Sequence, residues 1–500
     1  MSPGDVAQRL AGIDLGSNSF HMVVARVLQG QLHVVDRMRD RVQLAAGLDG
    51  HRELTPAAQQ QALTCLERFG ERVRDFPAGT VRAVGTNTLR VAKNARPFLE
   101  RAETALGHPI EIISGREEAR LVYLGVAHDL SDDAGRRLVV DIGGGSTECI
   151  VGERFEALQT DSLYMGCVSY SQRFFGNGKI RREDFRQAEI AALLELQSIE
   201  RRYRSMGWDQ AIGSSGTVVA VNQVLHDNGW SDDGITFKGL RRLRKALVAA
   251  GSTDQLRLPG LPADRAAVFP GGVAILLAIF ESFGLERMVA ATGALREGLL
   301  YDLLGRIRHE DVRDQTIRSF SQRYHVDVEQ AGRVERTALN LLEQVATDWE
   351  LAGLPERQFL SWASRLHEIG LSLAHTGYHK HSAYLIEHAD MPGFSREDQL
   401  MLALLVKNHR RKLSREDFRR LPNHLTKAAQ RLCVLLRLAV GLNRSRTPTQ
   451  LPRIHLWARG GTLQLSFPDG WFDEHPLTRA DLEEESKRLA SSGFVLDLAS

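Results

Sequence analysis

Short apolar runs alternate with amphipathic segments over most of the first 300 residues. Residues 55–74 predict an amphipathic helix, because Leu63, Leu66 and Phe69 would lie on one side of it. Strands that alternate with such helices predict a mostly parallel sheet, covered on both faces, with ligands at the carboxyl ends of its strands. The expected strands are 32–35, 81–84, 110–113, 138–140 and a strand within 211–217 that leads into a turn. The expected helices are 55–74, 86–106 and 185–204.

The pattern changes after Gly305, where apolar residues recur at helical spacing as far as about Ala439. This spacing predicts a separate helical domain. Residues 454–467, IHLWARGGTLQLSF, then alternate on both sides of two glycines, which predicts a small β-hairpin. The longest apolar stretch, GGVAILLAIFESFG at 271–284, is shorter than the roughly 20 residues that cross a bilayer, so we expect a buried helix there and no integral membrane segment.

Five hundred residues are too many for one hydrophobic core. The polar, turn-rich stretch SDDAG at 131–135 predicts a hinge between two α/β halves. The expected domains are therefore 1–133 and 134–306, both α/β, then a helical domain at 307–447 and a small α+β unit at 448–500.

Composition limits the kinds of ligand and the cellular compartment that we expect for the protein. The net charge is only +2, so the chain as a whole does not attract a polyanion strongly. A polyanionic ligand would need a locally basic path along the protein surface. The four cysteines form no C-x-x-C pair, which favours a reducing compartment over a disulfide framework or a zinc ribbon. The first ten residues lack the apolar core of a signal peptide. We expect a cytoplasmic protein, and peripheral association with the inner face of the cell membrane stays open.

The segment 138–148, LVVDIGGGSTE, joins an apolar run to an acid, three glycines, two hydroxyl side chains and a second acid. Glycines permit φ > 0 and let bare N–H groups face one anion. Asp141 and Glu148 flank them, and carboxylates beside a phosphate make electrostatic sense only when a cation such as Mg²⁺ lies between them. The segment therefore predicts a phosphate-holding β-hairpin with the binding residues Gly143, Gly144, Gly145, Ser146 and Thr147.

A second copy of this design lies near the N-terminus, where AGIDLGSNSF at 11–20 is followed by the strand-like HMVVARV. It adds Asp14 as a candidate metal ligand and Gly16, Ser17, Asn18 and Ser19 as candidate phosphate-binding residues. The two hairpins resemble the phosphate loops of the actin, sugar kinase and Hsp70 superfamily. That resemblance implies an α/β fold of two actin-like (ASKHA, ribonuclease H-like) domains with a catalytic cleft between them, followed by the helical domain and the small α+β unit.

A third glycine-containing turn, GSSGT at 213–217, precedes a predicted helix. The free N–H groups at a helix start can hold an anion, although the same turn can be a plain helix cap. The candidate phosphate-binding residues here are Gly213, Ser214, Ser215 and Gly216.

Further motifs lie between the two hairpins and after the second: VGTNTLR at 84–90 and SGREEAR at 114–120, then MGCVS at 165–169 and GALREG at 293–298. Together they resemble the exopolyphosphatase and guanosine pentaphosphate phosphohydrolase family. LHEIGLS and YHKHSAYLIEHADMPGFS resemble the C-terminal region of its long bacterial members. The resemblance covers nearly the whole chain and is nearer the exopolyphosphatase branch.

Glu117 and Glu118 open a predicted helix after the strand IEIIS, at the edge of the sheet where a ligand is expected. Acids in a first helical turn usually complement the helix dipole, but one of them suits a base that directs water at a phosphoanhydride. The resemblance implies that Glu118 is the catalytic carboxylate, that Glu117 is only a helix-terminal charge, and that Arg90 lies against substrate phosphate. The alternatives are a solvated Arg90 and hairpin-stabilising carboxylates. The expected cofactor is Mg²⁺, with K⁺ as a stimulating ion.

The helical domain concentrates histidines, which invites comparison with a metal site. It resembles the HD phosphohydrolase fold, but Glu368 follows His367 where that pattern has Asp, and Asn443 stands where a later acid is expected. We interpret it as a degenerate HD-like domain that serves binding or dimerisation, with an active second metal site as the alternative. The remaining histidines of the cluster are His379, His381, His388 and His409.

Basic residues cluster at 408–412, 419–431 and 443–446. Such runs are usually solvated helix faces, but here they would suit a track for a long polyanion. Nucleic acid is not expected, because no aromatic stacking platform accompanies them.

The leading hypothesis is a homodimeric exopolyphosphatase that removes terminal phosphate processively from linear inorganic polyphosphate. The alternative within the family is hydrolysis of guanosine pentaphosphate (pppGpp) to the tetraphosphate. A non-enzymatic polyphosphate or alarmone sensor is the alternative from another class, and a sugar or acetate kinase is disfavoured because no adenosine pocket is evident.

Overall fold

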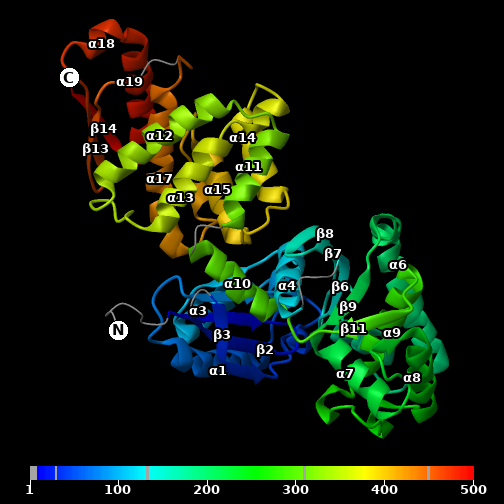
Figure 1. Ribbon diagram of the computed structural model, residues 1–500. Helices are drawn as coiled ribbons and strands as arrows, with labels where there is room; N and C mark the ends of the chain where they lie inside the picture. Colours follow the sequence, from blue (N-terminus) through cyan, green and yellow to red (C-terminus); the bar gives the residue numbers. More distant parts are fainter. Residues whose placement is uncertain (1–7, 29–30, 131–134, 308–310, 448–450, 500) are drawn as a thin grey trace. The chain divides into compact units, whose positions relative to one another are not determined.

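The computed structural model describes residues 8–28, 31–130, 135–307, 311–447 and 451–499. The chain divides into two compact units, 1–311 and 312–500 (Figure 1). The predicted hinge at 131–135 lies outside the described residues except for Gly135, and the predicted boundaries at 133/134 and 447/448 fall at or beside residues that are not described. The finer division of each unit into domains stays a prediction.

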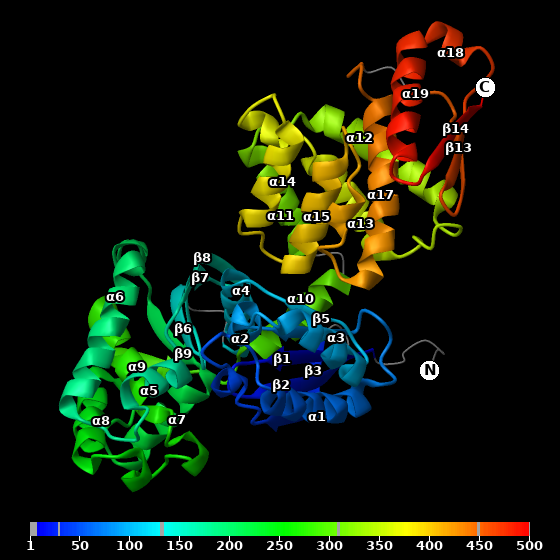
Figure 2. The same ribbon diagram turned by 180° about the vertical axis from the view of Figure 1, so that it is seen from behind.

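The first lobe of the first unit is a mixed sheet with helices on both faces. Its strand order is β3 (Gln31–Asp40), β2 (Phe20–Leu28), β1 (Arg9–Leu15), β4 (Val81–Gly85) and β5 (Ile110–Ile112). Helices α1 (Pro56–Val73) and α3 (Ala95–Leu106) cover one face, where Leu63, Leu66 and Phe69 are buried as expected. Figures 1 and 2 both show α10 (Leu295–Ile307) on the side of the sheet opposite α1.

The second lobe repeats the plan. Its strand order is β10 (Ile235–Thr236), β11 (Arg287–Ala290), β9 (Gln210–Ser214), β6 (Arg136–Ile142), β7 (Thr147–Glu153) and β8 (Glu156–Leu163). One face carries α5 (Cys167–Phe175), α6 (Arg182–Met206), α7 (Ser215–Asp227), α8 (Phe237–Ala250) and α9 (Phe269–Phe283). The other face packs on α4 (Gly115–Asp129), which also contacts β4 and α10 through one apolar cluster. Helix α9 is almost wholly buried, which confirms the prediction for 271–284.

Two predictions about this unit are wrong. The sheets are mixed rather than mostly parallel, because each hairpin adds antiparallel strands: β1 pairs antiparallel with β2 and parallel with β4. The helix expected at 86–106 is broken into α2 (Asn87–Val91) and α3. Pro97 lacks the N–H that would bond to the carbonyl group of Lys93, so a continuous helix is disfavoured there. The side chain of Asn94 in the break instead bonds to the backbone of Leu54.

Helices α4 and α10 cross at glycines, where their backbones touch. A Cβ atom added to Gly298 would lie 1.9 Å from the carbonyl oxygen of Leu121, and one at Gly125 would lie 2.1 Å from that of Ala294. On the other side of α10, a Cβ at Gly12 of β1 would lie 2.7 Å from the carbonyl oxygen of Arg296. Helix α10 is thus a close common support for β1 and α4.

We expect Gly298→Ala to destabilise the protein by about 1–3 kcal/mol, because the added methyl group meets backbone that cannot move independently. The matched control is Gly441→Ala in α17, where an added Cβ has no neighbour within 4 Å among the described residues. There the substitution should leave the stability of the protein unchanged or raise it by up to about 1 kcal/mol, because alanine has a higher helix propensity than glycine. Equal thermal unfolding of both variants and the parent would contradict the close crossing.

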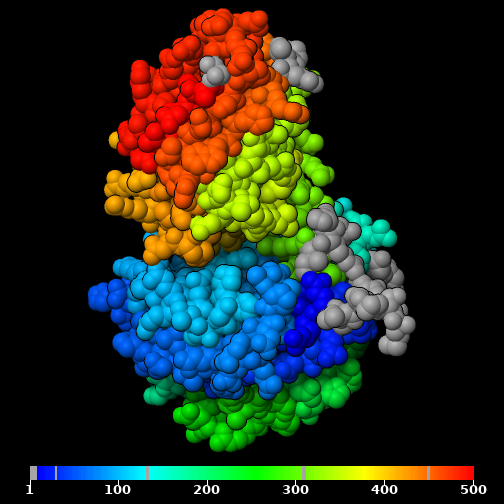
Figure 3. All heavy atoms as spheres, turned by 90° about the vertical axis from the view of Figure 1, so that its left-hand side faces the viewer, coloured from blue at the N-terminus to red at the C-terminus, as the bar shows by residue number. Residues whose placement is uncertain are grey.

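The second unit is helical and ends in a small α+β element, as predicted. The helices are α11 (Val312–Arg323), α12 (Val328–Val345), α13 (Leu354–Leu366), α14 (Tyr378–His388), α15 (Arg396–Asn408), α16 (Arg415–Phe418) and α17 (Asn423–Leu442). Strands β12 (His455–Arg459) and β13 (Thr462–Ser466) form the expected hairpin, and β14 (Val495–Ala499) pairs with β13. Helices α18 (Trp471–Glu474) and α19 (Pro476–Ala490) complete the element. Figure 3 shows its red residues lying against orange ones of this unit.

Two expectations drawn from composition can be compared with the structure. All four cysteines are buried free thiols, which agrees with the sequence-based argument against a disulfide framework. They are Cys65, Cys149, Cys167 and Cys433. Within the described ranges, none of the helices combines the length and the apolar character needed to cross a bilayer.

Candidate active site

The two predicted hairpins occupy equivalent places in the two lobes. Strands β1 and β2 pair with Asp14 opposite His21, and strands β6 and β7 pair with Asp141 opposite Glu148. Each aspartate is the next-to-last residue of its first strand, and the glycine-containing turn follows. The sequence repeat therefore corresponds to a structural repeat.

The hairpin tips meet at Gly144, where this contact explains the glycine. A Cβ at Gly144 would lie 2.9 Å from the Cβ of Ser17 in the other hairpin, and one at Gly166 would lie 2.3 Å from the carbonyl oxygen of Gly144. We expected glycine because of its access to positive φ, but Gly16 and Gly143 to Gly145 are not among the residues with positive φ. That reason is wrong, because close contacts with neighbouring residues, such as Ser17 at Gly144 and the carbonyl oxygen of Ser19 at Gly16, are what disfavour a side chain here.

A cavity of about 480 Å³ lies where the two lobes meet. Both hairpin turns, Glu118 at the start of α4, and the start of α7 border it. The residues predicted from sequence that line it are Asp14, Gly16, Ser17, Asn18, Ser19, Glu118, Asp141, Gly143, Gly144, Ser146, Ser215 and Gly216. The structure thus brings the candidate base, two candidate metal ligands and all three candidate phosphate loops to one cavity.

Several buried polar atoms around the hairpin turns lack a hydrogen-bond partner among the described residues. They are Asp14 Oδ1, Ser19 Oγ and Asn87 Nδ2. Buried polar groups are normally satisfied, and an unsatisfied group beside a cavity indicates a place for water, an ion or a ligand. These atoms offer both an acceptor for a cation and donors for an anion.

Glu118 is held at the start of α4 by local hydrogen bonds. Ser114 caps the helix: its Oγ accepts a bond from Glu117 N at 3.1 Å, and its carbonyl oxygen accepts one from Glu118 N at 2.9 Å. Arg90 Nη1 donates to Glu118 Oε2 at 2.6 Å and to the carbonyl oxygen of Ile113 at 3.1 Å. Arg90 is therefore a buried partner of Glu118 and not a solvated helix arginine.

The carboxylates of the cavity repel one another. Burial raises the pKa of Asp14 well above its usual value, and the charge of Glu118 raises it further. Burial raises the pKa of Asp141 to about 6, although a hydrogen bond with Ser214 limits the rise. Burial, then Glu118 and Asp141, raise the pKa of Glu148 well above its usual value. A cation at this place would relieve the repulsion.

The residues fit Mg²⁺ held by Asp14 and Asp141, since this ion commonly takes one or two protein carboxylates and completes its shell with water and substrate phosphate oxygens. No set of three His, Cys, Asp or Glu side chains in the described parts of the chain is arranged to hold a metal ion. Glu148 lies outside the cavity lining and accepts a hydrogen bond from Ser162 Oγ at 2.8 Å. Substrate oxygens and water would therefore supply the remaining ligands.

Other predicted residues support the cavity from outside its lining. Thr147 Oγ1 donates to the carbonyl oxygen of Met165 at 2.6 Å, and Ser214 Oγ donates to that of Gly293 at 2.9 Å. Gly213 is packed between Val218 and Met288. The predicted residues outside the lining are Arg90, Gly145, Thr147, Glu148, Gly213 and Ser214.

The sequence reading missed basic residues on the cavity wall. Arg296 belongs to the quoted GALREG motif and His21 opens the quoted segment HMVVARV, so both had a usable signal, whereas Arg39 and Arg265 lie in none of the quoted motifs. A Cβ at Gly216 would lie 1.7 Å from the Arg265 guanidinium, which places that side chain over the start of α7. Nearby Ser215 has φ of 90°, a conformation that non-glycine residues rarely adopt and that often marks functional sites.

Comparison with known families agrees with this arrangement. Residues 23–307 match the Ppx/GppA phosphatase family, and residues 312–486 match domain III of Ppx/GppA phosphatases. The chain belongs to the Ppx/GppA phosphatase family. The family predicted from the motifs is confirmed, and the protein is a phosphohydrolase of this family.

Relatives of this Ppx/GppA phosphatase match it over nearly their full lengths. Two of them, from Aeromonas hydrophila subsp. hydrophila and Vibrio vulnificus, are named guanosine-5'-triphosphate,3'-diphosphate pyrophosphatase. The first is 43% identical over 97% of both chains, and the second is 42% identical over 100% of both. A crystal structure of a Cytophaga hutchinsonii exopolyphosphatase is 25% identical, with a TM-score of 0.53, over 59% of this chain and 98% of that one. Two actin-like lobes are thus the fold of the first unit.

In the second unit of this phosphatase, the histidine cluster is partly assembled. The rings of His367 and His409 lie 5.2 Å apart, and those of His379 and His409 lie 6.3 Å apart. Burial lowers the pKa of each of these histidines, so they are neutral near pH 7. Glu368 is engaged by Arg446. His388 instead stacks on Tyr384. The function of this cluster stays a prediction.

In two of the three basic segments of the second unit, 419–431 and 443–446, basic side chains pair with acids. Arg420 bonds to Glu387, and Lys427 bonds to Glu350 at 2.8 Å. Arg444 Nη1 lies 2.5 Å from Asp481 Oδ1. This pairing reduces the free positive charge that a track for a long polyanion would need.

Proposed function

We propose that this phosphatase hydrolyses the terminal phosphoanhydride of guanosine-5'-triphosphate,3'-diphosphate. The observation that carries the proposal is the convergence of Glu118, two aspartates and the phosphate loops on one cavity. The choice of substrate rests on the names of relatives that match over both full lengths. It replaces the preference for polyphosphate drawn from the motifs, and the pairing of basic residues with acids in 419–431 and 443–446 favours the same choice.

In the proposed reaction, the hairpin turns bind the terminal phosphate between the lobes. Ser17, Asn18 and Ser19 approach it from one lobe, and Gly143, Gly144 and Ser146 approach it from the other. Mg²⁺ held by Asp14 and Asp141 would neutralise charge on the phosphate oxygens. The cradle therefore orients the anhydride without a covalent bond to the protein.

Glu118 orients a water molecule and accepts its proton as the water oxygen forms a bond to the terminal phosphorus atom. The anhydride P–O bond breaks, so the products are inorganic phosphate and guanosine bearing diphosphates at both positions. The 2.6 Å bond from Arg90 leaves one oxygen of Glu118 engaged and the other available to water. Arg90 thus orients the base in this scheme.

The test is a side-by-side assay of guanosine-5'-triphosphate,3'-diphosphate and linear polyphosphate with Mg²⁺. We expect kcat/KM for the nucleotide to exceed that for polyphosphate by at least tenfold. A preference for polyphosphate would overturn the choice of substrate. Measurable binding of both substrates without phosphate release would instead support a sensor.

A further inference from the structure

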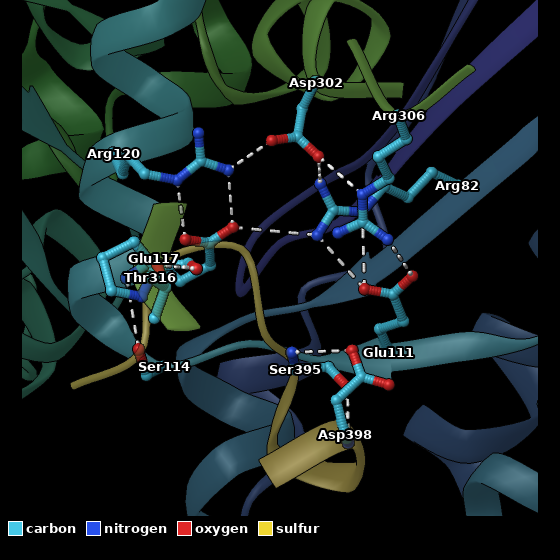
Figure 4. Close-up of polar contacts among 11 residues, drawn as sticks. Arg82, Glu111, Ser114, Glu117, Arg120, Asp302, Arg306, Thr316, Ser395 and Asp398 are labelled. Atoms are coloured by element: carbon cyan, nitrogen blue, oxygen red, sulfur yellow. Dashed lines mark hydrogen bonds and ion pairs between the residues drawn. The ribbon is translucent and has the colours of Figure 1, made fainter. Parts of the chain in front are cut away.

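Glu117, the neighbour of Glu118 on α4, belongs to an ion network whose residues lie outside the cavity lining. Its other members are Arg82 of β4, Arg120 of α4 and Asp302 of α10 (Figure 4). The side chains of Glu117, Arg82, Arg120 and Asp302 are 1%, 1%, 14% and 4% exposed, respectively. The network therefore joins three elements inside the protein. Glu117, expected from the sequence to be a plain helix-terminal charge, is one of its members.

The contacts of the network are short and directional. Arg120 donates two hydrogen bonds of 2.8 Å to the carboxylate of Glu117, and Arg120 Nη2 lies 2.5 Å from Asp302 Oδ1. Asp302 Oδ2 accepts from Arg82 at 2.6 Å and from Arg306 at 2.9 Å. The surrounding arginines hold the pKa of Asp302 well below its usual value, although burial opposes this. Asp302 is the acceptor on which three guanidinium groups converge (Figure 4).

Stability alone does not account for such a network. Burying charges costs desolvation, and well-packed apolar side chains of similar volume often serve stability as well or better. What paired guanidinium and carboxylate groups provide is fixed geometry, because both are planar and their bidentate bonds define an orientation. The network is thus suited to hold elements in one relative position.

The element that it holds is the one that carries Glu118. Successive residues of an α-helix point about 100° apart, so fixing Glu117 on one side of α4 fixes the direction of Glu118 on another. The glycine crossing sets the distance between α4 and α10, but packing contacts of this kind are less directional than hydrogen-bonded ion pairs. The pair of Asp302 and Arg120 adds a directional link between the two helices.

We propose that Arg120 and Asp302 are positioning residues for hydrolysis, which set the rotation of α4 and so place the Glu118 carboxylate in the cavity. The inference rests on the proposed function, because Glu118 must be the group that acts on water. Asp14 shares the same support, since β1 packs on α10 at Gly12. The network therefore also relates Glu118 to the metal-binding side of the cavity.

The test compares Asp302→Asn and Arg120→Lys in the parent protein and in a Glu118→Gln background. Asparagine keeps the shape of Asp302 without its charge, and lysine keeps the charge of Arg120 without its two-pronged bonds. A misplacement of about 1 Å can cost on the order of 100-fold in rate, so we expect kcat to fall by roughly 10- to 100-fold with KM changed less than about threefold. In the Glu118→Gln background the same changes should cost no further activity.

The matched control is Glu485→Gln, which breaks the buried Arg437–Glu485 pair of the second unit, whose side chains are 0% and 12% exposed. It should lower thermal stability without changing kcat. The proposal is overturned if both network variants keep the parent kcat, or if they lose as much activity without Glu118 as with it. Should Asp302→Asn fail to fold, Arg120→Lys decides.

Failure of the proposed function gives a different result. Full activity of Glu118→Gln by itself would remove Glu118 as the base, whatever the network variants do, and the positioning proposal would fall with it. Each variant is assayed on guanosine-5'-triphosphate,3'-diphosphate and on linear polyphosphate. A mistaken substrate choice then changes which assay reports activity, but it does not change the pattern among the variants.

Discussion

Replacement of Glu118 by glutamine is expected to lower kcat by roughly 10²- to 10⁴-fold, the usual contribution of a positioned acid–base group. The amide can still accept the hydrogen bond from Arg90, so the start of α4 should keep its structure. It cannot take a proton from water. Substrate binding should therefore persist, measured as an equilibrium Kd with Mg²⁺ present, while phosphate release under saturating substrate falls.

The control for this variant is Glu183→Gln, because Glu183 also lies in the first turn of a helix, α6, but outside the cavity lining. It should retain the parent kcat. Loss of substrate binding in Glu118→Gln, in step with the loss of kcat, would indicate a structural rather than a catalytic function of this residue.

Asp141→Asn is expected to raise the Mg²⁺ requirement at least tenfold or to abolish activity, because it removes one of the two carboxylates proposed to hold the ion. Without Mg²⁺ the same change should stabilise the protein at pH 7.5. The pKa of Asp141 is raised from 3.8 to about 6, so its contribution to stability is fully present below about pH 4 and is lost as pH rises through 6. Two pKa units correspond to about 3 kcal/mol.

Thermal unfolding at pH 5 and pH 7.5, with and without Mg²⁺, checks this prediction. Mg²⁺ should stabilise the parent more at pH 7.5, where Asp141 is ionised, and should stabilise Asp141→Asn little at either pH. Asp161→Asn is the control, because Asp161 is a buried carboxylate of the same lobe that pairs with Arg116 and Arg202 away from the cavity lining. An unchanged Mg²⁺ titration of Asp141→Asn would contradict the assignment.

The sequence predicted those parts of the fold and of the candidate site that depend on residues close together in the chain. The hairpin with Asp141 and its glycines is one continuous segment, and the capped start of α4 with Glu118 is another, so pattern and composition were enough to place them. Their meeting in one cavity followed from the repeat and from the family resemblance.

The parts that sequence could not predict depend on residues far apart in the chain. Glu117 has the same local signature as a solvent-exposed helix-terminal acid, yet its surroundings include Arg82 and, through Arg120, Asp302. Arg265 reaches Gly216 across some 50 residues with no motif around it. The function of Gly144 was predicted for the wrong reason, because its requirement comes from Ser17 in the other hairpin.

The position of α10 has a consequence for the order of folding during synthesis. Leu10, Val23 and Ala25 of the first sheet are buried against Leu300, Leu303 and Leu304 of this helix. The last strand of that sheet ends at Ile112, about 180 residues before α10 begins. At typical translation rates the ribosome needs roughly 10–40 s for that interval. The first lobe therefore emerges with this apolar face uncovered, and it can bury the face against α10 only after the second lobe has been made.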